Sequence, residues 1–308
     1  MKILEYIEQT SHDFEQAGLS YGHGTTNAFD EAVWLTLWKL NLPLENLDGV
    51  SQQELTTEEL ASLNALMHQR ISSRLPAAYL TQEAWLQGVP FYIDQRAIIP
   101  RSLIAEILAQ GLIDPWLEHA LASRQSTQPH ILDICTGNGS LAILCAMAWP
   151  DANVCATDIS SDALDIARIN LKKHNLENRI TLIQSDALAS PDIKKQAPYD
   201  LIICNPPYVN TQSMQALPAE YLAEPSLALA GGADGMTFIR PLLPLLADYL
   251  SENGFLVLEI GHERPYFEAA FPGLEALWLE TSAGEDQVVL ITQKSLRHTF
   301  ETTAPPSA

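Results

Sequence analysis

The hydrophobic residues near the start of the chain recur every three to four positions, a spacing typical of amphipathic helices. Asn27 precedes one such stripe and is a plausible N-cap, and Thr56 with Glu59 makes a capping-box pattern before another. The apolar positions of the two stripes are Phe29, Val33, Leu37 and Leu40, then Leu60, Leu63, Leu66, Met67 and Ile71. Residues 1–76 are therefore predicted to form a small helical domain, with these stripes in its core.

Beyond residue 100 the pattern changes to short apolar runs that alternate with helical stretches. The runs predict strands at 130–134, 153–157, 180–184, 199–204, 255–260, 277–280 and 288–291. Helices are predicted at 103–108, at 141–149 before Pro150, and near 236–249. This alternation predicts an α/β fold with a mostly parallel sheet and helices on both of its faces.

Three segments lie outside this alternation. Residues 77–99 carry aromatic side chains around a Gly-Val-Pro break, and we predict a β-hairpin there that links the helical domain to a second domain at 100–300. Residues 209–235 are rich in Pro, Ala, Gly and Glu, and an irregular stretch of this length predicts a flexible lid. The tail, 301–308, is expected to be disordered.

The run at 199–204 leads directly into Asn205-Pro206-Pro207-Tyr208. The prolines end the strand because they remove backbone donors and fix the chain direction. Open α/β sheets bind their ligands at this end of the strands. The Asn205 oxygen and the Pro206 carbonyl can accept hydrogen bonds from a planar nitrogen group, while the Tyr208 ring can stack on its face. The alternative is a simple turn, but the position after a strand favours a functional site.

A glycine-rich turn follows the strand at 130–134. Gly137 and Gly139 permit a tight turn and allow a ligand to approach the backbone closely. Asp158 ends the next strand, about twenty residues further on, where an acidic side chain can hold ribose hydroxyls. The third strand ends in Ser185-Asp186-Ala187, which could flank an adenine.

The glycine turn alone leaves two classes of enzyme open. Gly137-x-Gly139-x-x-Ala142 also fits a dinucleotide-binding turn, so a nicotinamide dehydrogenase competes at this step. The Asn-Pro-Pro-Tyr motif decides against it, because hydride transfer has no evident use for that motif. The order of motifs along the strands, over about residues 100–292, resembles that of S-adenosylmethionine-dependent amino-group methyltransferases.

Composition and charge narrow the choice of partner. The 308 residues include 38 acidic and 17 basic side chains, a net charge of −21. This weighs against nucleic acid and suits a basic protein, although a merely soluble or salt-adapted surface explains it equally well. The four cysteines lie in apolar runs without a CxxC pair, which predicts buried, reduced thiols and no zinc site. Because we find neither a signal peptide nor an apolar run that could span a bilayer, we predict a cytoplasmic protein.

Additional motifs make the resemblance more specific. The full set is Pro100-Arg101, the turn 133–139, Asp158, Ser185-Asp186, Asn205-Pro206-Pro207-Tyr208, Glu224-Pro225 with Ala228-Leu229, and Glu259-Ile260-Gly261. With this set the chain is similar to the protein glutamine N5-methyltransferases, which methylate one glutamine side chain in a translation protein. One branch acts on the Gly-Gly-Gln motif of release factors, and the other on the third protein of the large ribosomal subunit. The segment 21–25, with Asn27, 30–32 and 100–102, resembles the ribosomal branch.

The resemblance implies a seven-stranded, mostly parallel, Rossmann-like class I methyltransferase sheet, with the helical domain recognising the substrate. It implies S-adenosylmethionine as methyl donor, a basic ribosomal protein as partner, and no metal, nucleic-acid or membrane partner. Asn205, Pro206 and Tyr208 would be catalytic, and would bind the glutamine together with Pro207 and Arg101. The implied cofactor-binding residues are Asp133, Cys135, Thr136, Gly137, Asn138, Gly139, Asp158, Ile159, Ser185, Asp186, Ala187 and Asn205.

Four residues qualify this interpretation. Cys135 stands where many relatives carry glycine, and Ala187 where some carry a larger side chain, so each could alter cofactor affinity. His23 lies between two glycines, which favours a structural role over that of a catalytic base. Arg101 could face a cofactor carboxylate, a substrate or solvent. The rival functions are the release-factor branch, a nucleic-acid amino-group methyltransferase, and a non-enzymatic assembly factor with a vestigial cofactor pocket.

Overall fold

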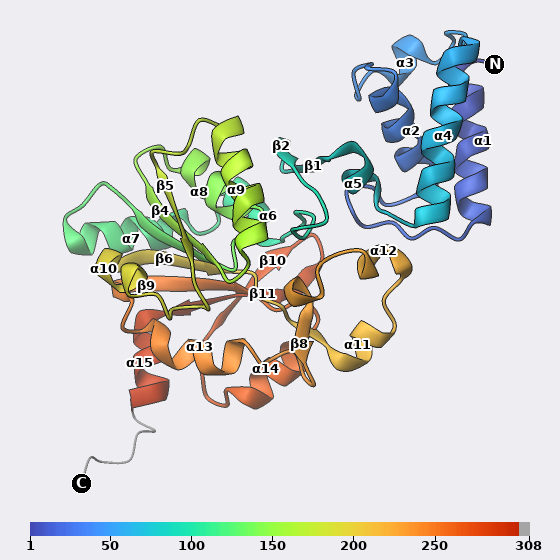
Figure 1. The fold of residues 1–308 in the computed structure, drawn as a ribbon. Coiled ribbons are helices and arrows are strands. Elements are labelled where there is room, and N and C mark those ends of the chain that lie inside the picture. Colours follow the sequence, from blue (N-terminus) through green and yellow to red (C-terminus); the bar gives the residue numbers. More distant parts are fainter. Residues whose placement is uncertain (302–308) are drawn as a thin grey trace.

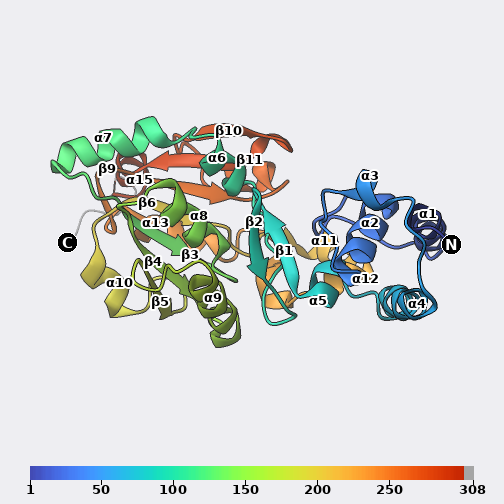
Figure 2. The same cartoon turned by 90° about the horizontal axis from the view of Figure 1, so that it is seen from above.

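The computed structural model describes residues 1–301. Of the predicted disordered tail 301–308, Glu301 instead ends a helix, and 302–308 lie outside the described residues. A helical domain, a short hairpin and an α/β domain follow one another along the chain (Figure 1). Seen from above, the hairpin lies between the two domains, and α12 (Ala219–Leu222) lies beside the helical domain (Figure 2). Within residues 1–301, none of the helices has the length and apolar character needed to cross a membrane.

The helical domain contains four helices and a core of its own. Both predicted caps are confirmed: the Asn27 side chain accepts the backbone N–H of Asp30, and Thr56 forms a reciprocal capping box with Glu59. Most of the predicted stripe residues are buried or pack against this core, but Phe29, in the first turn of its helix, is 38% exposed and its assignment to the core is wrong. The helices are α1 (Ile3–Gln16), α2 (Ala28–Lys39), α3 (Leu47–Val50) and α4 (Thr57–Ser73).

The linking segment is partly helical. Strands β1 (Glu83–Leu86) and β2 (Val89–Tyr92) form the predicted antiparallel hairpin. Residues 77–81, expected within it, form helix α5 (Ala77–Thr81), which ends where Gln82 adopts a left-handed conformation. A small cluster of buried residues packs the linking segment against α9, and this contact ties the hairpin to the α/β domain. The cluster includes Ala78, Tyr79, Ala84, Ile93, Ala97, Ile99, Ala163 and Ile166.

The α/β domain contains a seven-stranded sheet in the order β10-β11-β9-β6-β3-β4-β5. The five strands from β9 to β5 are parallel, while β10 and β11 pair antiparallel at one edge. The predicted strands are confirmed, although β9 and β11 begin earlier than expected. Their bounds are β3 (His130–Ile134), β4 (Asn153–Asp158), β5 (Ile180–Gln184), β6 (Tyr199–Cys204), β9 (Leu250–Glu259), β10 (Leu277–Thr281) and β11 (Gly284–Thr292).

Helices cover both faces of this sheet (Figure 1). Strand β6 shows why, since alternate side chains point to opposite faces: Leu201 and Ile203 join one core, Ile202 and Cys204 the other. The first core also takes residues from α6 (Ile104–Ala109), α7 (Asp114–Arg124), α8 (Ser140–Ala148) and α9 (Ser161–Lys173). The second takes residues from α10 (Pro191–Gln196), α13 (Ile239–Leu246), α14 (Arg264–Ala270) and α15 (Gln293–Glu301).

The segment 209–235, expected to be a long loop, is folded into short elements. Strands β7 (Val209–Asn210) and β8 (Ala230–Gly232) pair with each other in parallel. Between them lie α11 (Thr211–Gln215), α12 (Ala219–Leu222) and a short 3-10 helix (Ser226–Ala228). Two buried carboxylates of this segment, Glu220 and Glu224, make ion pairs with arginines outside it. The segment is therefore anchored to the rest of the molecule along its length.

Candidate functional site

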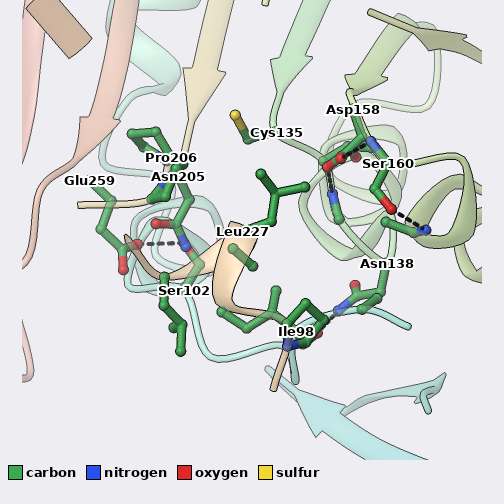
Figure 3. A pocket seen from close by; sticks show the side chains of 18 of the residues that line it. Ile98, Ser102, Cys135, Asn138, Asp158, Ser160, Asn205, Pro206, Leu227 and Glu259 are labelled. Atoms are coloured by element: carbon green, nitrogen blue, oxygen red, sulfur yellow. Dashed lines mark hydrogen bonds between the residues drawn. The ribbon is translucent and has the colours of Figure 1, made fainter. Parts of the chain in front are cut away.

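A cavity of about 510 Å³ opens where the parallel strands β3 to β6 end. Nearly all of the sequence-predicted site residues line it, including Asn205 to Tyr208, Asp158 and Arg101. Asp133 and Gly139 are not among the residues that line the cavity. Figure 3 shows Asn205 and Pro206 beside Glu259 on one side of the pocket, Asp158 and Ser160 on the other, and Leu227 between them.

The glycine turn adopts the backbone that its sequence suggests. Cys135, Gly137 and Gly139 all have positive φ values, of 63°, 56° and 81°. Any residue with a Cβ is strained in the left-handed region, so the backbone at Cys135 would favour glycine. A Cβ on Gly139 would lie 3.1 Å from the Ala167 Cβ, so glycine at this position lets α8 start close to α9.

Asp133 supports this turn from inside the protein. Its Oδ2 accepts hydrogen bonds from the Thr136 hydroxyl at 2.5 Å and from the Ala142 N–H at 3.1 Å. Its other oxygen, Oδ1, is buried without a hydrogen-bond partner among the residues described. Burial raises the pKa of Asp133 to about 7, against the opposing effect of the two hydrogen bonds. These contacts favour support of the turn as the role of Asp133, and direct binding of the cofactor by this side chain stays a prediction.

Asp158 links the end of β4 to the turn that follows the neighbouring strand β3. Its Oδ2 accepts the Gly137 N–H at 2.8 Å, and its Oδ1 accepts the Ser160 N–H at 2.9 Å. Burial raises the pKa of Asp158, although these backbone hydrogen bonds act in the opposite direction. The neighbouring Ile159 is 47% exposed and lines the cavity, and Ser185, Asp186 and Ala187 line it from the end of β5. This half of the cavity thus has two acidic residues, Asp158 and Asp186, beside apolar side chains such as Ile159.

The Asn-Pro-Pro-Tyr motif lines the cavity from the end of β6, and Tyr208 is fixed in two ways. Its hydroxyl donates to the Glu259 Oε1 at 3.2 Å. One side of its ring lies so close to Gly261 that a Cβ there would overlap it. Burial raises the pKa values of Tyr208 and Glu259, so the phenol stays protonated and can donate. The orientation of the Tyr208 ring is therefore set by the end of strand β9 and by Gly261, which follows it.

Glu259 is a site residue whose contacts the sequence did not reveal. Its Oε2 accepts from the Ser102 hydroxyl at 2.5 Å and the Leu103 N–H at 2.9 Å, while its Oε1 faces Tyr208. It is 3% exposed and lines the cavity. A signal was available: the motif Glu259-Ile260-Gly261 places an acid at the carboxyl end of a buried strand, where ligands bind.

Arg101 lines the cavity, but its guanidinium is engaged by Glu224. The two side chains form a bidentate pair, with Nη1–Oε1 and Nη2–Oε2 distances of 2.7 and 2.6 Å. Glu224 also accepts the Ile99 N–H at 3.0 Å. On the other side of Glu224, the Nε2 of buried His23 lies 3.5 Å from its Oε2. Arg101 as a substrate-binding residue stays a prediction, and His23 does not line the cavity.

The Glu224 contacts predict how stability depends on acid. Burial alone would raise the pKa of Glu224, but its contacts with His23 and Arg101 outweigh burial and lower the pKa from 4.5 to about 2. Because the folded pKa is depressed, the ionised form stabilises the protein above pH 4.5, and this stability is lost as the pH falls toward 2. A shift of this size is worth about 3 kcal/mol.

We therefore expect Glu224→Gln to be less stable than the wild type by a nearly constant amount above pH 5. The deficit should shrink below pH 4.5. Urea unfolding of both proteins between pH 2.5 and 7 measures this, with the exposed Glu58→Gln as the matched control. The difference in the free energy of unfolding between the wild type and Glu224→Gln should decrease below pH 4.5. A difference that stays constant there would contradict a depressed pKa for Glu224.

Comparison with known proteins identifies the class to which this fold belongs. The family model described as "Methyltransferase small domain" matches residues 116–232. A solved structure of the hMettl16 catalytic domain in complex with MAT2A 3'UTR hairpin 1 has a TM-score of 0.50 over 99% of this chain and 95% of that chain, at 14% identity, which shows the fold alone. The fold and the family match define this chain as a Rossmann-like methyltransferase.

Curated relatives narrow the class to one family. The chain is 49% identical to the ribosomal protein uL3 glutamine methyltransferase of Bordetella pertussis, over 96% of each chain. It is 48% identical to the protein of the same name from Burkholderia pseudomallei, over 96% of this chain and 95% of that one. The corresponding protein of Neisseria gonorrhoeae is 46% identical over 92% and 91%. The chain belongs to the ribosomal protein uL3 glutamine methyltransferase family.

Proposed function

We propose that this enzyme transfers a methyl group from S-adenosylmethionine to the side-chain nitrogen of a glutamine in ribosomal protein uL3. The observation that carries the proposal is that Asn205 to Tyr208 and the Asp158 region line one cavity, in a chain that belongs to this family. The net charge of −21 supports a basic protein as the partner. Four free cysteines and a ribosomal substrate support a cytoplasmic location.

The cavity suits S-adenosylmethionine in size and in chemistry. A volume of about 510 Å³ lies within the usual range for sites of small ligands and cofactors. Asp158 would accept the ribose hydroxyls, and the turn 135–139 would receive the amino-acid end of the cofactor. The adenine would lie between Ile159 and the segment 185–187. When bound, S-adenosylmethionine supplies an electrophilic methyl group on a positively charged sulfur.

The remaining task of the protein is to present a poor nucleophile. The lone pair of an amide nitrogen is delocalised into its carbonyl, and the amide is too weak an acid for a side chain to deprotonate first. Fixing the nitrogen in line with the methyl group can contribute roughly 7–11 kcal/mol, according to effective molarities of intramolecular reactions. The Asn205 oxygen and the Pro206 carbonyl would accept the two amide hydrogens. They would also stabilise the positive charge that develops on the nitrogen.

Tyr208 and Pro207 complete this arrangement. The Tyr208 ring would cover one face of the amide plane, and its contact with Glu259 keeps it in place. Pro207 would hold the turn rigid. After methyl transfer the nitrogen loses a proton, for which water is a sufficient acceptor.

Asp158→Ala is expected chiefly to weaken the binding of S-adenosylmethionine. Loss of charged hydrogen bonds to the ribose should raise its dissociation constant about 10- to 100-fold. Isothermal titration calorimetry measures this, and Asp165→Ala on the exposed face of α9 is the control. An unchanged dissociation constant for Asp158→Ala would remove this residue from the cofactor site.

The function itself is tested by offering a labelled methyl donor to separately purified uL3, release factors and other basic ribosomal proteins. We expect label on uL3, and mass spectrometry should place it on a glutamine side chain. Label on a release factor alone would favour the other branch of the family. A gel shift at low salt addresses the nucleic-acid alternative, for which we expect no binding.

A further inference from the structure

Tyr221 lines the same cavity from α12, in the segment that follows the Asn-Pro-Pro-Tyr motif. It is partly exposed, and Leu217 and Pro225 line the cavity beside it. The roles proposed above for the cavity residues leave Tyr221 without one. Its position in a wall contributed by the segment 209–235 puts it with the substrate-facing residues.

Two parts of the chain, the turn at 21–24 and Arg101, contact the Tyr221 side chain. The His23 ring packs against it, with the ring centroids 4.3 Å apart and tilted by 51°. The Arg101 guanidinium carbon lies 5.3 Å from the ring centroid. The Tyr221 hydroxyl makes a long hydrogen bond, 3.5 Å, to the Tyr21 carbonyl, and a Cβ on Gly22 would overlap that hydroxyl. The Tyr21 to Gly24 turn is therefore shaped around this one side chain.

Buried ion pairs fix α12 on both sides of Tyr221. Glu220, the preceding residue, is fully buried. It pairs with Arg70 in the last turn of α4 at 3.2 Å and with Arg74, the residue that caps α4, at 3.0 Å. Glu224, three residues further on, pairs with Arg101 and contacts His23. Breaking either set would leave a buried charge without a partner. The helical domain thus determines where Tyr221 stands in the cavity.

The charges of this wall suit a neutral ligand. Within residues 1–301, the arginines that line the cavity are Arg96 and Arg101, and each is paired with a carboxylate, Asp94 and Glu224 respectively. Neither presents a free cation to a phosphate. The Tyr221 ring contacts an imidazole and a guanidinium whose charge is compensated, and it is itself partly exposed in the cavity wall. It therefore offers an uncharged aromatic surface, which is suited to a peptide group or a side-chain amide.

We propose that Tyr221 contacts the protein substrate next to the target glutamine and determines the affinity of the enzyme for that protein. His23 acts as the positioning residue that keeps the ring in place. This inference rests on the proposed function. It assigns to the Tyr21–Thr25 turn of the helical domain a part in shaping the catalytic pocket itself.

The test compares steady-state kinetics of the full-length enzyme with uL3 as the substrate. Tyr221→Ala should raise KM for uL3 about tenfold, while the dissociation constant of S-adenosylmethionine changes less than about twofold. Tyr221→Phe keeps the ring and should stay near the wild type. His23→Ala should raise KM in the same direction, and His23→Phe, which restores a ring, should recover most of the loss. Leu222→Ala, at a residue that is 63% exposed and does not line the cavity, is the control.

The outcomes separate this inference from the proposed function. No methylation of uL3 by the wild type refutes the proposed function. Methylation by the wild type, with a Tyr221→Ala variant that folds and keeps the wild-type KM, refutes the inference alone. A Tyr221→Ala variant that loses affinity only for S-adenosylmethionine also overturns it. If thermal unfolding shows that the alanine variant does not fold, Tyr221→Leu, which fills much of the same space, takes its place.

Discussion

Asn205→Ala is expected to lower kcat for uL3 methylation by about 100- to 1,000-fold, the range seen when one preorganised polar group that stabilises developing charge is removed. The motif places this side chain at the end of β6, in the wall of the cavity that also contains Asp158. In the ground state the amide is neutral, and positive charge grows on its nitrogen only as the methyl group arrives. The loss should therefore fall on turnover.

The same variant should bind S-adenosylmethionine almost normally. The cofactor half of the cavity is built from the ends of β3, β4 and β5. The dissociation constant of S-adenosylmethionine should therefore change less than about fivefold in Asn205→Ala. Single-turnover rates at saturating cofactor measure the chemical step, and calorimetry measures cofactor binding. Asn253→Ala, near the start of β9 and away from the cavity, is the matched control. An Asn205→Ala enzyme with a normal single-turnover rate would contradict the assigned role.

The parts of the fold that were predictable from sequence are those in which a short stretch determines its own structure. The strand β6 is buried at every position, so it appears in the sequence as a continuous apolar run, and the following prolines mark its end. The caps at Asn27 and Thr56 depend on side chains three residues apart. Because the functional motifs stand directly after such strands, most of the predicted site residues meet in one cavity.

The parts that were not predictable depend on contacts between distant residues or on very short elements. The Arg70 to Glu220 pair joins residues 150 positions apart, and the Glu224 contact with Ile99 spans 125. A single sequence carries no signal for such partners. Helices of four or five residues, such as α11 and α12, are too short to produce a periodic apolar stripe, so the segment 209–235 looked like a loop. Helix α5 was mistaken for strand because its one aromatic residue, Tyr79, lies among the aromatics of the hairpin.

The buried ion pairs between the helical domain and α12 predict a large effect on stability. Arg70 has no exposed surface, and its guanidinium pairs with Glu31 at 2.7 Å and with Glu220 at 3.2 Å. Arg70→Met keeps the apolar stem but leaves two buried carboxylates with fewer partners. Removing one member of such a group typically destabilises a protein by about 3–5 kcal/mol. The free energy of unfolding, measured in urea, should fall by an amount in this range.

The pH dependence of that deficit distinguishes unpaired charge from lost packing. Burial raises the pKa of Glu31, and Arg70 opposes this effect, so the pKa should rise further in Arg70→Met. An acid whose folded pKa exceeds its unfolded value destabilises the protein increasingly as the pH rises, hence the deficit should be larger at pH 8 than at pH 5. Adding Glu220→Gln should restore part of the stability, because it removes a buried carboxylate that has lost one of its two arginine partners and keeps only Arg74. Arg168→Ala, which breaks only an exposed pair with Asp165, should cost less than about 1 kcal/mol. A deficit for Arg70→Met that stays the same at both pH values would assign the loss to packing and not to the buried carboxylates.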